Sequence, residues 1–135
     1  MRKTVVIAVL AGCLVCLAWS GTAYAHHSAS SQYDVEKVMS FKGVLTRVEW
    51  VNPHAHMTFD VTGKDGKTTP WVIEFFGVSG LHRMGLANKG VLKIGDTYSL
   101  EVSPARDGRP AGIIQSLKFP DGRVYSTASV PPELR

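Results

Sequence analysis

Histidines carry the clearest chemical signal in this chain of 135 residues, because four of its five histidines form two tight clusters. His26 and His27 are adjacent, and His54 and His56 are separated by one residue. Imidazole binds zinc, copper and nickel, so such clusters favour a site for a divalent transition metal. On a β-strand, residues two apart share a face at a spacing of about 7 Å, so His54 and His56 could bind one ion. The sequence predicts a histidine site for copper(II) first and zinc second.

The residues before the first cluster have the pattern of a secretory signal peptide. A basic start, an apolar run and the A-x-A-type sequence at residues 23–25 predict a signal peptide over residues 1–25. Cleavage after Ala25 would make His26 the first residue of a periplasmic protein. Its α-amine and its ring could then chelate one metal ion, an arrangement called a histidine brace.

A lipoprotein is the alternative for the same segment. The sequence LAGC at residues 10–13 matches a lipobox, in which Cys13 would carry the lipid. The apolar region before it would be shorter than the roughly 7–15 residues usual in signal peptides, so we favour cleavage after Ala25. Membrane contact is expected only through the signal peptide, unless Cys13 is lipidated.

Removal of the signal limits what the remaining chain can do. Both cysteines, Cys13 and Cys16, would be lost, leaving no disulfide and no thiolate. Arg2 and Lys3 would also be lost, so 13 of the 15 Lys and Arg would remain against 11 Asp and Glu. A net charge of +2 gives no basic surface for nucleic acid. No serine lies in a G-x-S-x-G nucleophile elbow, which favours a binding protein over an enzyme.

Alternating apolar and polar residues predict a mainly β fold. Strands are expected at residues 38–51, 54–62, 71–76, 97–103, 112–119 and 124–125. One helix is expected at residues 79–88, with Ser79 as its N-cap. We therefore expect a small, strongly curved antiparallel sheet or OB-like barrel of five to six strands with one short helix.

The chain after the signal divides into three parts. Residues 26–37 are polar and are expected to form an extended N-terminal arm, residues 38–127 the β-barrel domain, and residues 128–135 a flexible tail. In the first strand, alternation places Val44 and Val48 on one face and Leu45 on the other. In the second strand it predicts an apolar face of Ala55, Met57, Phe59 and Val61. Gly43 indicates a bulge or bend in that strand.

Two acidic residues are weaker candidates for ligand contacts. The alternation of residues along the strand places Asp60 on the same face as His54 and His56. There it could orient an imidazole ring or bind the metal. Glu74 interrupts an apolar run, and we expect it to pair with Arg47 or Arg83 or to face a pocket.

Trp50 and Arg106 are the other weak candidates. The aromatic ring of Trp50 is expected to line the core or a pocket. Arg106 lies in an expected loop at residues 104–110, where it could bind an anion, a partner protein or a neighbouring acid such as Asp107. A barrel without metal, binding an envelope protein or a small ligand, is the alternative to the metal site.

Short motifs along the whole chain after the signal support a resemblance. They are His26-His27-Ser28, Tyr33-Asp34, Gly43-x-Leu45, Trp50-x-Asn52-Pro53-His54, Leu81-x-Arg83-x-Gly85, Gly95-Asp96 and Pro104-Ala105-Arg106-Asp107-Gly108. Together they resemble the small exported bacterial proteins of the domain of unknown function 6152 family. The resemblance implies a small, β-rich periplasmic protein and implies no activity. It places His26, His27 and His54 among the family's signature positions, which favours a shared site.

Overall fold

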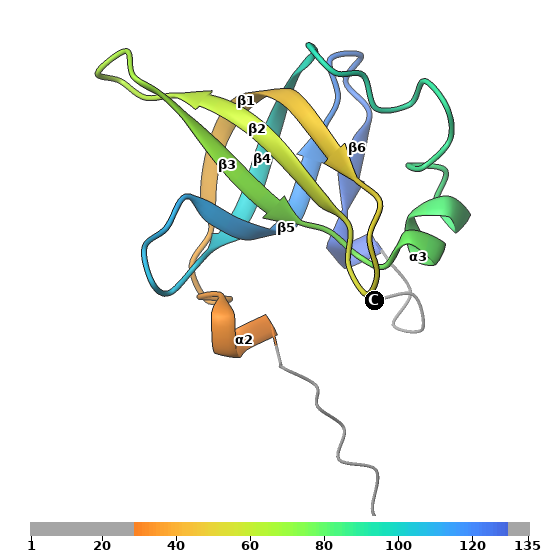
Figure 1. Cartoon of the computed structure of the whole chain (residues 1–135), viewed down its shortest axis with the longest axis horizontal. Helices are drawn as coiled ribbons and strands as arrows, with labels where there is room; N and C mark the ends of the chain where they lie inside the picture. The colour runs from red at the N-terminus through yellow and green to blue at the C-terminus, as the bar shows by residue number, and fades with distance from the viewer. Residues whose placement is uncertain (1–28, 130–135) are drawn as a thin grey trace, which may run out of the picture.

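β-Strands are the main secondary structure of the computed structural model, which describes residues 29–129 (Figure 1). The strands are β1 (Met39–Glu49), β2 (His56–Thr62), β3 (Thr68–Glu74), β4 (Thr97–Pro104), β5 (Ala111–Lys118) and β6 (Val124–Ser126). The helices of this part of the chain are α2 (Ala29–Gln32), α3 (Val78–Arg83) and the 3₁₀ turn η1 (Thr127–Ser129).

The first five strands close into a barrel. Hydrogen bonding follows the order β3-β2-β1-β4-β5-β6, and a parallel pairing of β3 with β5 closes the ring. The strand β6 lies outside the ring, paired only with β5. With α3 between β3 and β4, the element order is that of an OB-like barrel. The predicted fold class is confirmed.

β1 contributes to both sides of the barrel because it bends. Its first half, up to Val44, pairs with β4, and the half from Val44 onward pairs with β2. The register shifts between Leu45 and Arg47, so Thr46 has no paired residue in β2 and forms a bulge. This extra residue reverses the alternation, and Leu45 and Val48 both pack into the core. The prediction that they lie on opposite faces is therefore wrong.

The barrel interior is filled by side chains from every strand of the ring and from the segment around α3. Its fully buried large residues include Leu45, Met57, Phe59, Ile73, Phe75, Leu81, Tyr98, Leu100, Ile114 and Leu117. The predicted inward face of the second strand is confirmed, because Ala55, Met57 and Phe59 are completely buried. This packed interior leaves the outer faces and the loops as the places for function.

The helix α3 is shorter than predicted. Gly85 has a φ of +78°, which ends the helical conformation, and turns continue from there to the start of β4. The N-cap is Gly77 rather than Ser79. Leu81 and Leu86 are nevertheless buried, so the inward face of the segment is as expected. No helix among residues 29–129 has the length and apolar character needed to cross a membrane.

The N-terminal arm also differs from the expected extended form. Its residues Ala29–Gln32 form the short helix α2, and Tyr33 then pairs with Ala105 as a β-bridge. The residues before Ala29, which include His26 and His27, and those after Ser129 lie outside the described part of the chain.

Close approach of β4 and β5 depends on Gly112. A Cβ at this position would lie 2.8 Å from the carbonyl oxygen of Ser103 and 3.2 Å from Cγ2 of Val102. Since the nearest of these atoms is backbone within the barrel, we expect Gly112→Ala to lower the free energy of unfolding by about 1–3 kcal/mol. Urea unfolding followed by tryptophan fluorescence would show a lower midpoint, whereas Thr69→Ala, at an exposed position, should leave it unchanged. Equal midpoints for Gly112→Ala and the wild type would contradict this packing.

Candidate functional site

Glu74, at the end of β3, joins the N-terminal segment to the loop before β2. Its Oε2 accepts a hydrogen bond of 2.6 Å from the hydroxyl of Tyr33, and its Oε1 is hydrogen-bonded to Nδ1 of His54. The Glu74 side chain is only 15% exposed, so these two partners compensate for the water that burial removes. We call Tyr33, His54, His56 and Glu74 the Glu74 cluster.

The pairing of β2 with β3 explains why these residues meet. His56 lies directly opposite Glu74 in the register. The pairing continues past the start of β2, because the amide of Phe75 donates to the carbonyl of Ala55 and the amide of Ala55 donates to the carbonyl of Phe76. Ala55 points into the core, so the residues on either side of it point outward, on the side of Glu74.

His54 is held in an orientation suited to binding a ligand. An ionised carboxylate only accepts hydrogen bonds, so the ring nitrogen Nδ1 carries the proton of the bond to Glu74. The other ring nitrogen, Nε2, then has a free electron pair, and the side chain is 47% exposed. Histidines that bind metals usually donate their second ring N–H to a carboxylate or carbonyl in this manner.

Tyr33 fixes the other oxygen of Glu74. It is 5% exposed, and the amide of the next residue, Asp34, donates to the carbonyl of Pro104. Burial, followed by the hydrogen bond to Glu74 and its charge, raises the pKa of the Tyr33 phenol well above its ordinary value of 10.0. The phenol therefore stays protonated and remains a donor to Glu74.

This raised pKa predicts a loss of stability at alkaline pH. Because the pKa of Tyr33 is higher in the folded state, its contribution is complete below the ordinary value of 10.0 and is lost as the pH rises above it. In the wild type, Tyr33 should make the free energy of unfolding fall by up to about 1.4 kcal/mol per pH unit at alkaline pH. In Tyr33→Phe this part of the decline should be absent. Urea unfolding at a series of alkaline pH values measures the decline. Tyr125, whose pKa is also raised by burial, is present in both proteins and cancels in the comparison. Parallel pH profiles for the two proteins would contradict this role of Tyr33.

Arg106 anchors the N-terminal segment to the loop between β4 and β5. Its amide donates to the carbonyl of Gln32, its Nε donates to the carbonyl of Ser30 at 2.9 Å, and its guanidinium lies 3.8 Å from the carboxylate of Asp34. The expected salt bridge of Arg106 with Asp107 or another acid is formed with Asp34. Arg106 thus holds the arm that carries Tyr33.

His56 borders a hollow beside the cluster. This hollow has a volume of about 310 Å³, and its lining includes His56, Tyr33, Val72 and Arg109. Within the described residues, the ring of His56 has no hydrogen-bond partner. The hollow therefore places a second imidazole and a guanidinium next to Tyr33.

The described part of the chain does not hold a complete metal site. Among residues 29–129, no three His, Cys, Asp or Glu side chains form a group that could hold a metal ion. The other two predicted ligands, His26 and His27, lie outside these residues. His27 precedes Tyr33 by six residues, a length of chain that spans at most about 20 Å. The sequence therefore limits the distance of His27 from Tyr33 to about 20 Å.

The two acidic candidates, Asp60 and Glu74, differ from the predictions in the residues that they contact. Asp60 lies four residues further along β2 than His56, a distance of about 13 Å along the strand. The carboxylate that orients a histidine is instead Glu74. Arg47 forms its ion pair with Glu49 at 2.8 Å, and Glu74 is bonded to Tyr33 and His54. The predicted pairing of Glu74 with Arg47 or Arg83 is therefore wrong. The alternative expectation, that Glu74 faces a pocket, stays a prediction.

Trp50 is more exposed than expected. Its exposed fraction is 43%, and its ring stacks on that of His82 with the centroids 6.5 Å apart. The prediction that Trp50 lines the core is wrong, because it lies in the loop after β1. Tyr33 is the residue of the cluster that the composition and alternation of the sequence did not single out. Only its place in the Tyr33-Asp34 motif pointed to it.

Comparison with known proteins gives one finding. The model of a family of unknown function, DUF6152, matches residues 13–115, which include both histidine clusters, Tyr33 and Glu74. No curated protein is significantly similar to the chain.

Proposed function

The chain belongs to the DUF6152 family, and we propose that it is an exported, periplasmic, non-catalytic protein that binds a divalent transition metal through histidines. Copper(II) is the first candidate and zinc the second, because the ligands are imidazoles and no thiolate would remain after cleavage of the signal. Metal delivery, buffering or sensing are the roles open to such a protein.

The observation that carries the proposal is the hydrogen bonding of His54. Glu74 binds Nδ1 of its ring, Tyr33 fixes Glu74, and Nε2 is left free on a half-exposed side chain. His54 is therefore bonded to a carboxylate that is itself held in place by a buried tyrosine. As a metal ligand, it gains both a fixed ring orientation and higher basicity from such a carboxylate.

The mature N-terminus supplies the remaining ligands in this proposal. Cleavage after Ala25 would provide the α-amine and ring of His26, together with His27, on an arm anchored at Tyr33 and Arg106. His56, whose ring has no partner among residues 29–129, is the fourth histidine within reach. Because only a short segment separates His27 from Tyr33, little loop-closure entropy is lost when the N-terminal histidines and His54 bind the same ion.

The position of the cluster on the barrel is a further argument by analogy. His54 lies in the loop between β1 and β2, and Tyr33 pairs as a β-bridge with Ala105, in the loop between β4 and β5. OB-fold barrels bind their ligands on the face of strands 2 and 3 and on these two loops. The analogy supports a binding role without specifying the ligand.

A matched pair of proteins tests the proposal. One begins at His26 with a free α-amine, and the other is acetylated at this amine, so that the amine cannot bind a metal. We expect acetylation to weaken copper(II) binding at least about ten-fold, because the chelate of amine and ring is lost. Isothermal titration at neutral pH measures both affinities. Equal affinities would remove the N-terminus from the site.

The hollow beside His56 favours one alternative, a module that binds an envelope protein or a small ligand without metal. Its lining includes both apolar surface from Val72 and positive charge from Arg109. The variant His54→Ala, whose changed residue does not line the hollow, would retain its partner under this alternative. Under the proposal above it would bind copper(II) at least about 100-fold more weakly.

A further inference from the structure

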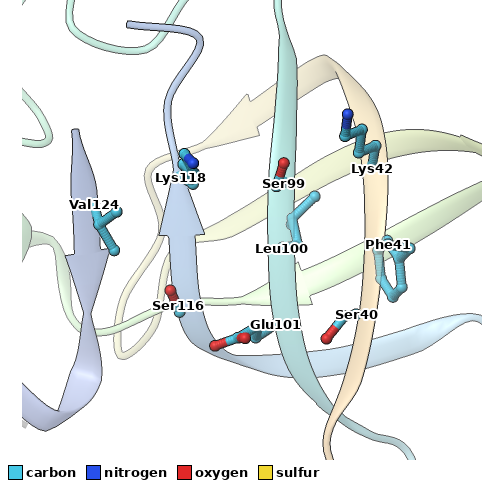
Figure 2. Close-up of a pocket in the computed structure, with 9 residues that line it drawn as sticks. All are labelled: Ser40, Phe41, Lys42, Ser99, Leu100, Glu101, Ser116, Lys118 and Val124. Atoms are coloured by element: carbon cyan, nitrogen blue, oxygen red, sulfur yellow. The ribbon is translucent and has the colours of Figure 1, made fainter. Parts of the chain in front are cut away.

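A second hollow lies over the outer face of β1, β4 and β5 and shares no residue with the Glu74 cluster (Figure 2). Its volume is about 460 Å³, within the usual range for small-molecule sites. Its polar lining residues are Ser40, Lys42, Ser99, Glu101, Ser116 and Lys118. Neither the histidine chemistry nor the anchoring of the arm uses any of them.

Strand register arranges these six residues in two rows across the sheet. The first row is Lys42, Ser99 and Lys118. The second row is Ser40, Glu101 and Ser116. The two rows are separated by two residues along each strand, which is about 7 Å. Figure 2 shows the two lysines toward one end of the hollow and Glu101 toward the other.

The charged side chains of the hollow form no ion pairs with one another, and the two lysines lie toward the opposite end from Glu101. Among residues 29–129, Lys42, Lys118 and Glu101 take part in no ion pair and no side-chain hydrogen bond. The two lysines lie two strands apart, about 10 Å between backbones, so their long side chains can reach one anion above Ser99. The short side chain of Ser99 between them leaves the floor of the hollow open.

We propose that this hollow binds a small zwitterion. Its anionic group lies between the ammonium groups of Lys42 and Lys118, over the hydroxyl of Ser99. Its ammonium group lies at the carboxylate of Glu101, which is flanked by the hydroxyls of Ser40 and Ser116. Two positive charges in one row and one negative charge in the next favour a ligand with opposite charges a few bonds apart over a simple anion or a simple cation.

Three probes of similar length test the charge pattern. They are 4-aminobutanoate, which is a zwitterion, butanoate, which has only the carboxylate, and butylamine, which has only the ammonium group. The metal-free protein is titrated with each probe, and amide chemical shifts are recorded by NMR. We expect 4-aminobutanoate to bind most tightly and to shift amides of β1, β4 and β5 around Ser99. Equal binding of all three probes, or no shift in these strands, would overturn the proposal.

Substitutions then test the two ends of the hollow separately. Lys42→Ala and Lys118→Ala should each weaken 4-aminobutanoate about three- to five-fold, while Lys64→Ala, on an exposed turn, should not. Glu101→Gln should reduce binding of 4-aminobutanoate to the level of butanoate. Unchanged affinity in these three variants would overturn the site. Because no metal is present, neither outcome bears on the role of His54.

Discussion

Replacing His54 with alanine is expected to lower the copper(II) affinity of the mature protein at least about 100-fold, because the barrel loses its one oriented imidazole. The N-terminal histidines would remain. We therefore expect His54→Ala to retain only the affinity that the N-terminal histidines and His56 provide, at or above that of a free peptide with the sequence of residues 26–32. Competition titration with a chelator measures all three affinities on one scale.

His82→Ala is the matched control for this variant. The ring of His82 is exposed and stacks on Trp50, outside the Glu74 cluster. Its loss should leave copper(II) affinity unchanged. If His54→Ala bound copper(II) as tightly as the wild type, the N-terminus alone would account for binding, and the barrel would have no part in the site.

The second large effect is expected at Glu74. Glu74→Ala removes the group that orients His54, and loss of such a partner usually lowers metal affinity about 10- to 100-fold. It also leaves the buried hydroxyl of Tyr33 without its acceptor, which should lower the free energy of unfolding by about 1–3 kcal/mol. Metal titration and urea unfolding of the same variant measure both effects.

Two further variants separate the effects on binding and on stability. Glu74→Gln keeps an oxygen that can accept one hydrogen bond, so it should recover part of both losses. Tyr33→Phe, which leaves Glu74 bonded to His54 alone, should reduce metal affinity less than Glu74→Ala does. A Glu74→Ala protein with unchanged copper(II) affinity would show that His54 needs no carboxylate, and Glu74 would then be a structural residue only.

Local patterns in the sequence were sufficient to predict most of the barrel. Alternation along residues 54–62 identified the inward face of β2, because burial of one face repeats every two residues. The bulge at Thr46 was not predictable in the same way, since it depends on which residues of β2 lie opposite β1. The early end of α3 at Arg83 was also missed, although the positive φ of Gly85 just beyond it suits the residue type.

The candidate site was predictable only in part, for a similar reason. Residue type and spacing identified His54 and His56 as the histidines of the barrel. Their partner Glu74 lies 20 residues from His54, and Tyr33 lies 41 residues from Glu74, so only strand pairing brings the three together. Asp60, which a local pattern favoured, lies too far along β2.

The most direct test of metal binding by His54 is a count of the imidazoles bound to copper(II). Pulsed electron paramagnetic resonance of the copper-loaded mature protein detects each imidazole through its remote ring nitrogen. We expect the spectrum of His54→Ala to show one imidazole fewer than the wild type, while His82→Ala matches the wild type. Identical spectra for His54→Ala and the wild type would contradict a metal site on this barrel.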